Sequence, residues 1–77
     1  MDRSTFLQQA ESGGIRPDAY SLGRRVDEAY VMEGSLLGWS TFYCERGLRT
    51  DRRWFLRQSD ALSDLMERLE RDGSTRR

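Results

Sequence analysis

The spacing of apolar residues changes once in the second half of the chain, and this change constrains the fold more than any other feature. Between residues 28 and 56, apolar and polar side chains tend to alternate, as they do along a half-buried strand. From residue 59 to residue 71 the apolar side chains instead follow the period of an amphipathic helix. The helical stripe consists of Leu62, Leu65, Met66 and Leu69.

The alternating region divides into three expected strands. Residues 29–32 favour one strand, residues 39–44 favour a second that is rich in aromatic side chains, and residues 50–56 favour a third. Residues 46–47, Arg-Gly, are typical of a tight turn between the last two strands. Because the links are short, we expect a three-stranded antiparallel meander.

A short helix is expected before the strands. Thr5, with Gln8 three residues later, fits a capping box, and Phe6 and Leu7 lie on the apolar side of the same segment. The glycine pair at residues 13–14 can end this helix, since glycine adopts the left-handed cap without steric cost.

The C-terminal helix has its own start and stop signals. Ser59 is a suitable N-cap and Gly73 ends the helix, so residues 73–77 are expected to be a frayed tail. We therefore predict a single small α+β domain over residues 1–77, in the order α-β-β-β-α, with both helices on one face of the sheet. The expected core consists of Phe6, Leu7, Ile15, Val31, Leu62, Leu65, Met66 and Leu69, together with one set of sheet aromatics.

Composition argues against catalysis. The 77-residue chain has no histidine, all of its basic residues are arginine, and Cys44 is its one cysteine. It therefore lacks an imidazole base, a Schiff-base lysine and the paired thiols of a disulfide or a multi-thiolate metal site. We expect a protein that is not an enzyme and uses no cofactor or metal, with Cys44 as a small packing residue.

Targeting signals are weak in this sequence. No stretch approaches the roughly 20 apolar residues of a membrane span, and residues 1–9 lack the apolar core of a signal peptide. A lone cysteine is compatible with a reducing compartment. We expect a cytoplasmic protein that has no membrane partner.

Arginine is concentrated in one segment of a chain whose formal net charge is zero. Residues 46–57 contain five arginines and one acidic residue, whereas residues 1–45 have an excess of acidic residues. The segment could bind anions and stack nucleic-acid bases on Trp54, or its charges could simply protect a sheet edge. The zero net charge disfavours nucleic acid, so a nucleic-acid-binding or regulatory module using residues 46–57 is the alternative function.

Aromatic side chains must occupy both faces of the expected sheet. Trp39 and Tyr43 share one face of their strand, while Phe42 points to the other. A two-residue turn would pair Trp39 with Trp54, whereas a slip of one residue would place Trp54 on the face of Phe42. Two short helices cover only one face, so aromatic area is left for a partner or a second copy, unless the segment before the strands covers it.

Several motifs between residues 18 and 69 resemble a family of small bacterial proteins. Residues 20–22, Tyr-Ser-Leu, precede a strand; Trp39 opens the next; and that strand ends in residues 43–47, Tyr-Cys-Glu-Arg-Gly. Phe55 then leads into an acidic, alanine-containing helix. Such proteins are presumed to be immunity proteins of polymorphic toxin systems. The resemblance implies stoichiometric binding of a cognate toxin encoded nearby, with no catalytic residues.

Three positions depart from the family pattern. Cys44 replaces a serine, the loop at residues 34–38 is apolar where charge is usual, and Trp54 and Leu56 surround Phe55 where polar residues are usual. The last two departures add apolar surface where this chain could meet its own partner. We predict that the partner contacts the uncovered sheet face and the hairpin end, and that a homodimer through the same face is a further possibility. The predicted contact residues are Trp39, Tyr43, Glu45, Arg46 and Trp54.

Overall fold

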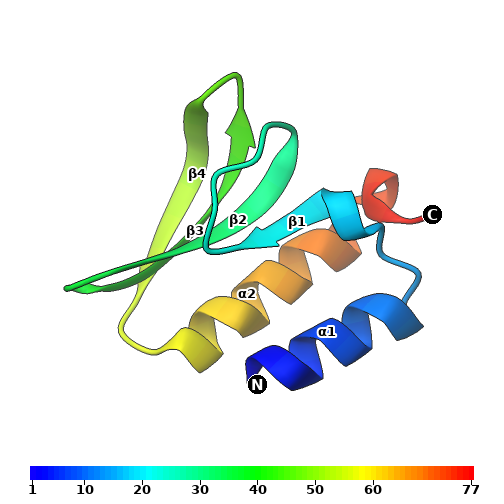
Figure 1. The fold of residues 1–77 in the computed structure, drawn as a ribbon, viewed down its shortest axis with the longest axis horizontal. Coiled ribbons are helices and arrows are strands. Elements are labelled where there is room, and N and C mark those ends of the chain that lie inside the picture. Colours follow the sequence, from blue (N-terminus) through cyan, green and yellow to red (C-terminus); the bar gives the residue numbers. More distant parts are fainter.

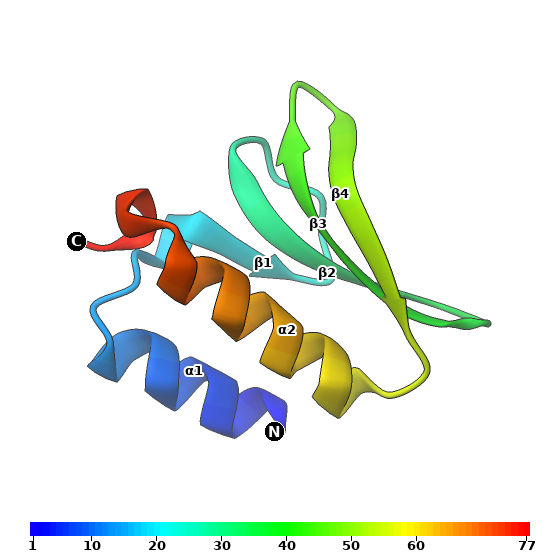
Figure 2. The ribbon, with the colours of Figure 1, turned by 180° about the vertical axis from the view of Figure 1, so that it is seen from behind.

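The computed structural model describes residues 1–77 and consists of two helices and a four-stranded sheet (Figure 1). Helix α2 lies against the sheet and α1 packs against α2 on the same side, which Figure 2 shows from behind. The expected α+β class is confirmed. The elements are α1 (Arg3–Ser12), the 3-10 turn η1 (Pro17–Ala19), β1 (Tyr20–Leu22), β2 (Ala29–Ser35), β3 (Gly38–Glu45), β4 (Leu48–Phe55), α2 (Gln58–Arg71) and the 3-10 turn η2 (Gly73–Thr75).

The sheet has four strands and is mixed, so the predicted three-stranded antiparallel meander is wrong in this detail. The strand order is β1-β2-β3-β4, and β1 runs parallel to β2 with Tyr20 opposite Tyr30. A three-residue strand carries no periodic signal of its own. Residues 23–28 then return the chain to β2, a connection far shorter than the usual crossover of about a dozen residues.

A β-bulge sets the register between β3 and β4. The predicted turn at residues 46–47 joins these strands, but the pairing shifts by one residue farther along. Asp51 lies at this irregularity with φ of 55°, in the left-handed region. Trp39 therefore pairs with Phe55 instead of Trp54, and Trp54 points away from the helices. This is the one-residue slip that the sequence left open.

The main core lies between the two helices and the sheet. Phe6 and Ile15 are buried there with the apolar stripe of α2, as expected. Leu7 was expected in the core but is 46% exposed, because Phe6 and Ala10 define the buried side of α1. The buried members of this core are Phe6, Ala10, Ile15, Ala19, Met32, Ala61, Leu62, Leu65, Met66 and Leu69.

The helix starts differ from those predicted. The carboxylate of Asp2, and not a side chain at Thr5, caps α1 by accepting the Thr5 backbone N–H at 2.7 Å. Helix α2 begins one residue before Ser59, and Arg57 at its N-cap position gives no side-chain cap. Neither helix has both the length and the apolar character needed to cross a membrane.

The C-terminal segment is held in place, so the prediction of a frayed tail is wrong. Thr75 is buried, and its hydroxyl donates to the backbone carbonyl of Leu69 at 2.7 Å. Two backbone hydrogen bonds, Arg16 N–H to Thr75 C=O and Arg77 N–H to Gly14 C=O, join the segment to the chain after α1. This pairing depends on residues far apart in sequence, which local composition does not reveal.

A second, smaller buried cluster lies on the face of the sheet turned away from the helices, which we call the outer face. Val31, Phe42 and Cys44 form it, and each is almost fully buried. The guanidinium carbons of Arg49 and Arg52 lie 5.9 and 5.7 Å from the Phe42 ring centroid. Arginine side chains therefore take part of the place that a second helical layer would occupy.

Candidate functional site

Four large apolar side chains are exposed together at one end of the sheet. Leu36 and Leu37 form the β2–β3 turn, which projects away from the C terminus (Figure 1), while Trp54 and Leu56 lie where β4 ends. Trp54 is 56% exposed and the three leucines are far more exposed. Leu37, Trp54 and Leu56 line one shallow depression of about 200 Å³ with Phe55. We call Leu36, Leu37, Trp54 and Leu56 the apolar end.

Close packing fixes the turn that carries Leu36 and Leu37. A Cβ atom on Gly34 would lie 2.7 Å from the Trp39 ring, which packs directly over this glycine. Gly38 has φ of 139°, and a Cβ there would lie 2.5 Å from the carbonyl oxygen of Phe55. Side chains are excluded at both glycines, which fixes the turn backbone, and the two leucines between them are exposed to solvent.

The indole of Trp54 is held in its exposed position by a neighbouring arginine. The guanidinium carbon of Arg52 lies 4.2 Å from the Trp54 ring centroid, a cation–π contact. Arg52 also forms an ion pair with Glu33 at 3.6 Å, and Glu33 is shared with Arg25 at 2.9 Å and Arg49 at 3.4 Å. The hydrogen bond from Arg25 lowers the pKa of Glu33, so this carboxylate stays charged near neutral pH.

The predicted contact residues fall in three separate places. Trp39 and Tyr43 are half-buried on the helix side of β3, where Trp39 packs against the main core. Glu45 and Arg46 are exposed at the β3–β4 turn, at the far end of β3 from Trp54. Only Trp54 belongs to the apolar end. The five residues thus do not form one continuous surface.

Sequence reasoning did not include Leu36, Leu37 and Leu56 among the contact residues. The signal for them was nevertheless present, because the apolar loop at residues 34–38 and the leucine after Phe55 depart from the family pattern. The structure brings these two departures together beside Trp54, which neither segment indicates alone.

Most arginines of residues 46–57 are already matched with carboxylates. Arg53 donates to Asp64 at 2.8 Å, and Arg49 and Arg52 both have Glu33 as an ion partner. Two arginines near the ends of the segment have no ion pair: Arg46 and Arg57. The segment therefore offers less free positive charge than its composition indicates.

Asp64 anchors α2 to the sheet and belongs to the fold more than to a binding site. It accepts hydrogen bonds from the Thr41 hydroxyl at 2.6 Å, from Arg53 at 2.8 Å and from Arg68 at 2.9 Å. Burial alone would raise the pKa of Asp64, but these hydrogen bonds outweigh it and hold the pKa below its ordinary value. Arg68 also donates to the Asp51 carbonyl at 2.6 Å, which ties α2 to the bulge.

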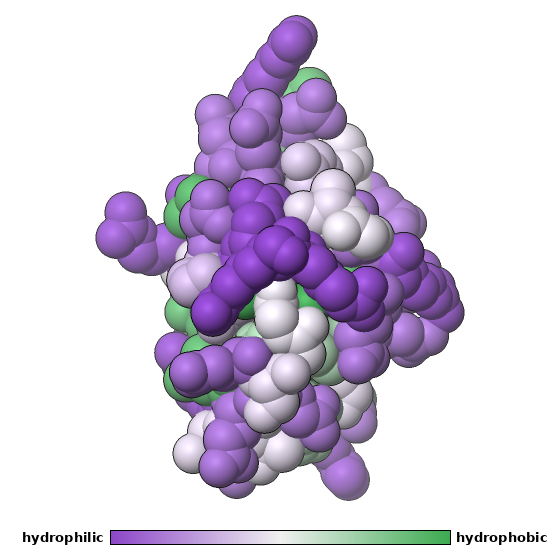
Figure 3. All heavy atoms as spheres, turned by 90° about the vertical axis from the view of Figure 1, so that its right-hand side faces the viewer, coloured by the Kyte–Doolittle hydropathy of each residue, from purple (hydrophilic) through white to green (hydrophobic).

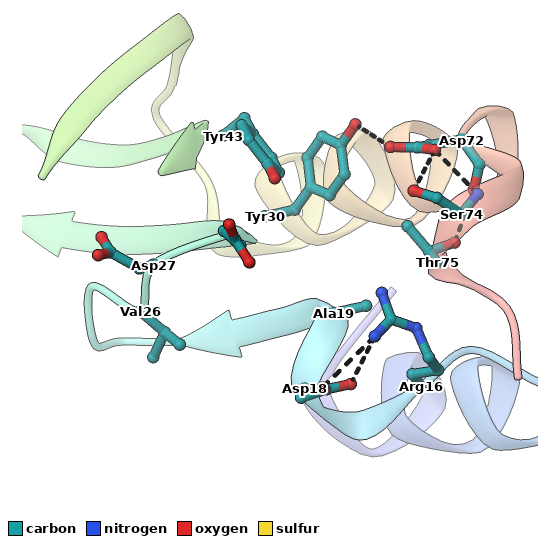
Figure 4. A pocket seen from close by; sticks show the side chains of 11 residues that line it. Arg16, Asp18, Ala19, Val26, Asp27, Tyr30, Tyr43, Asp72, Ser74 and Thr75 are labelled. Carbon is teal, nitrogen blue, oxygen red and sulfur yellow. Dashed lines mark hydrogen bonds and ion pairs between the residues drawn. The ribbon is translucent and has the colours of Figure 1, made fainter. Parts of the chain in front are cut away.

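A concave site, which we call the tyrosine cleft, lies at the opposite end of the sheet from the apolar end. Figure 4 shows the side chains that line it. Its volume is about 340 Å³. The rings of Tyr30 and Tyr43 form one wall, with centroids 4.9 Å apart and planes at 61°. The Tyr30 hydroxyl donates to Asp72 at 2.8 Å. The lining residues are Arg16, Asp18, Ala19, Val26, Asp27, Glu28, Tyr30, Tyr43, Asp72, Ser74 and Thr75.

Protonation in the cleft is fixed by these contacts. Burial, and then the hydrogen bond to Asp72, raise the pKa of Tyr30 to about 12. Hydrogen bonds from Ser74 and Tyr30 lower the pKa of Asp72. At neutral pH the phenol is therefore neutral and the carboxylate is charged. The surrounding side of the molecule, which carries the C-terminal segment, presents mostly hydrophilic side chains (Figure 3).

The arrangement of polar groups offers no evident reaction centre. Cys44 is buried, and its thiol donates a long hydrogen bond of 3.9 Å to Asp27. No three acidic or thiol side chains are grouped so that they could hold a metal ion. The surface has two notable features: the apolar end at one end of the sheet and the charged, aromatic tyrosine cleft at the other.

Comparison of the chain with protein-family models, with curated proteins and with solved structures finds no match. The resemblance to toxin-immunity proteins therefore stays a prediction from the motifs. The two surface features above are the observations from which a function can be argued.

Proposed function

We propose that this chain is a protein-binding module without catalytic activity, and that it neutralises a cognate bacterial toxin by forming a stoichiometric complex. The observation that carries the proposal is the apolar end, where Leu37, Trp54 and Leu56 line one depression and Leu36 is exposed next to Leu37 in the turn. Large apolar side chains gathered on a surface are typical of sites where another protein binds. The motifs shared with immunity proteins supply the class of partner.

The apolar end has the properties of a binding anchor. Covering one exposed leucine contributes roughly 1.5–3 kcal/mol, and tryptophan is among the residues that most often dominate a protein interface. Trp54 is already held by Arg52, and the glycines at positions 34 and 38 fix the adjoining turn. The Trp54 indole and the turn backbone therefore have little freedom left to lose on binding, which lowers the entropic cost of their part of the contact.

The charges beside the apolar end indicate the chemistry of the partner. Arg57 follows Leu56 directly and has no ion pair, while Arg52 is one of three arginines that share the single carboxylate of Glu33. The expected partner surface is an apolar pocket flanked by carboxylates. Such charge complementarity affects the association rate and specificity more than the affinity.

The proposal predicts that a secreted toxin is encoded beside this gene, and that toxin is the probe for the test. Co-expression should protect cells, and calorimetry should give a complex of fixed stoichiometry. Trp54→Ala is expected to weaken binding by about 2 kcal/mol with the thermal melting temperature unchanged. Leu48→Ala is the matched control, since Leu48 is 68% exposed but lies at the β3–β4 turn. Cell death despite wild-type protein, or equal binding by both variants, would contradict the proposal.

Nucleic-acid binding by residues 46–57 is the alternative, and the exposed Trp54 beside Arg52 is the observation that favours it. Its support is weaker because three of the five arginines in the segment are in ion pairs with Glu33 or Asp64. Fluorescence anisotropy with a single-stranded RNA oligomer tests it directly. Strongly salt-dependent binding that is lost in Trp54→Ala would favour this alternative.

A homodimer through the apolar end is the remaining possibility. It would bury the exposed leucines of two copies against each other, and it would place Arg57 of both copies near the same contact. Sedimentation over a range of concentrations tests it. A stable dimer that dissociates in Leu37→Ser would favour self-association over toxin binding.

A further inference from the structure

We propose that the tyrosine cleft binds a guanidinium group, either on a small molecule or on an arginine side chain of a peptide or protein. The cleft lies at the opposite end of the sheet from the apolar end and shares no lining residue with it. Guanidinium binding in the cleft can therefore be confirmed or contradicted whether or not the chain binds a toxin.

The first support is the shape and the walls of the cavity. A volume of about 340 Å³ lies at the lower end of the range for small-molecule sites. Four separate parts of the chain enclose it, and Figure 4 shows Tyr30 and Tyr43 along one side with Arg16 and Asp18 on another. The hydrogen bond from Tyr30 to Asp72 and the edge-to-face contact with Tyr43 fix the aromatic wall before any ligand arrives.

The second support is the balance of charge around this wall. Four carboxylates and one guanidinium group line the cavity, although the chain as a whole is neutral. Arg16 is paired with Asp18 at 3.2 Å. The other three carboxylates, Asp27, Glu28 and Asp72, have no ion partner. Asp27 accepts the Gly47 backbone N–H at 3.1 Å and Asp72 accepts hydrogen bonds from Tyr30 and Ser74, so Glu28 is the one whose side chain has no partner. The cavity therefore disfavours anions and attracts a cation.

The third support distinguishes an organic cation from a metal ion. The acidic side chains are not grouped as metal ligands, and the rings of two tyrosines take up one wall. A planar guanidinium group can lie on a tyrosine ring while its N–H groups donate to carboxylates at the side. Both phenols stay neutral because burial raises the pKa of Tyr30 and of Tyr43. Both phenol groups of the aromatic wall thus stay protonated across the neutral pH range.

The chain itself provides one guanidinium group at this site. Arg16 lines the cavity with a side chain that is 40% exposed, and the side chain of Asp18 that it contacts is 76% exposed. An external guanidinium group would share the same negative surroundings and be repelled by Arg16. Removing this charge should therefore tighten binding, an effect that a purely structural role of the cleft would not produce.

The test is an NMR titration that follows the ring signals of Tyr30 and Tyr43. The probes are N-acetyl-arginine methylamide and methylguanidine, with the uncharged N-acetyl-citrulline methylamide as the matched control. We expect saturable shifts of both rings with the two guanidinium probes and none with citrulline. Stronger binding of the arginine amide would assign the site to an arginine side chain, and stronger binding of methylguanidine to a free small molecule.

Variants of the lining residues complete the test. The Glu28 side chain has no hydrogen bond or ion pair to lose, and its backbone N–H keeps its bond to the Cys44 carbonyl, so Glu28→Gln should weaken the arginine probe about two- to fivefold without unfolding the protein. Arg16→Gln should tighten binding by a similar factor, and Asp60→Asn, at the exposed start of α2 outside the cleft, should leave it unchanged. Equal binding of the citrulline probe, absence of shifts at either ring, or no response to Glu28→Gln and Arg16→Gln would overturn the proposal.

Discussion

Both faces of the sheet have residues at their centres that are buried from solvent. Aliphatic side chains of α2 cover the residues on one face, whereas arginine side chains cover those on the outer face. Met32 on the helix side and Val31 on the outer side are each fully buried. Leu65 and its neighbours on α2 belong to the cluster around Met32, whereas Arg49 and Arg52 lie over the outer cluster. A 77-residue chain can thus cover two faces with one helical layer, because arginine has a long apolar stem beneath its charge.

The helical layer and the arginine layer should differ in how far they relax when a buried residue beneath them is made smaller. Aliphatic side chains in a helix-backed core are closely packed and cannot fully collapse around a deletion. Arginine side chains on the outer face are partly solvated and held by shared ion pairs to Glu33, so they can settle toward a smaller neighbour. Substitutions on the helix side should therefore cost more than similar ones on the outer side.

The largest effect is expected on the helix side. Leu65→Ala removes fully buried atoms between α2 and the sheet and should lower the free energy of unfolding by about 2–5 kcal/mol. Urea denaturation followed by circular dichroism measures it. Leu48→Ala, at an exposed leucine, should change the value by less than about 0.5 kcal/mol. Equal small losses in both variants would mean that α2 does not cover the sheet in solution.

The next effect concerns the polar contact between α2 and β4. Asp64→Asn removes the charge that faces Arg53 and Arg68, and should cost about 2–3 kcal/mol at pH 7. Since the pKa of Asp64 is lowered in the fold, its contribution is present above the ordinary value of 3.8 and is lost as the pH falls through the folded pKa. Denaturation at pH 7 and pH 3 should show a smaller wild-type advantage at pH 3. A difference that does not change with pH would contradict this.

A smaller loss is expected on the outer face. Val31→Ala deletes two methyl groups from the cluster beneath Arg49 and Arg52, and the transfer term alone is about 1.6 kcal/mol. Because the arginines can settle into the space, the cavity term is small, and we expect a loss of about 1.5–2 kcal/mol and a smaller cost per deleted carbon than in Leu65→Ala. An equal or larger cost per carbon, measured by urea denaturation, would show that the outer cover is as rigid as the helical one.

The smallest effect is expected at the cysteine. Cys44→Ser should change the free energy of unfolding by less than about 1.5 kcal/mol, because the swap is close to isosteric although it is more polar. Cys44→Leu, which adds bulk to the same buried position, should cost more. Thermal melting of the two variants compares them. A large loss in Cys44→Ser would mean that this position does not tolerate polarity.

Features with a local signal could be predicted from the sequence. The stripe of α2 follows from the spacing between Leu62 and Leu69, and the opposite orientations of Trp39 and Phe42 follow from strand alternation. The bulge had no such signal, because Asp51 is neither a glycine nor in a recognisable turn motif. Strand β1 is too short to show a period, and only its pairing with β2 defines it.

The candidate site was predictable only in part, because most of it depends on contacts between residues that are far apart in the sequence. Alternation indicates which side chains share a face but not which face the helices will cover, so Trp39 and Tyr43 were assigned to the uncovered side. The slip that exposes Trp54 was an open alternative, and the apolar loop at residues 34–38 was already marked as unusual. The tyrosine cleft was not foreseen, because its lining comes from four segments that meet only in the folded chain.

The bulge at Asp51 also affects how copies of this protein meet in a crowded solution. Strand β4 is an edge of the sheet, and an unpaired edge is a template on which further strands can add. The left-handed residue interrupts the regular row of backbone groups, and Arg49, Arg52 and Arg53 would approach their own counterparts in a second copy. The chain can therefore display a cluster of leucines at the end of its sheet while its edge resists growth into a fibril.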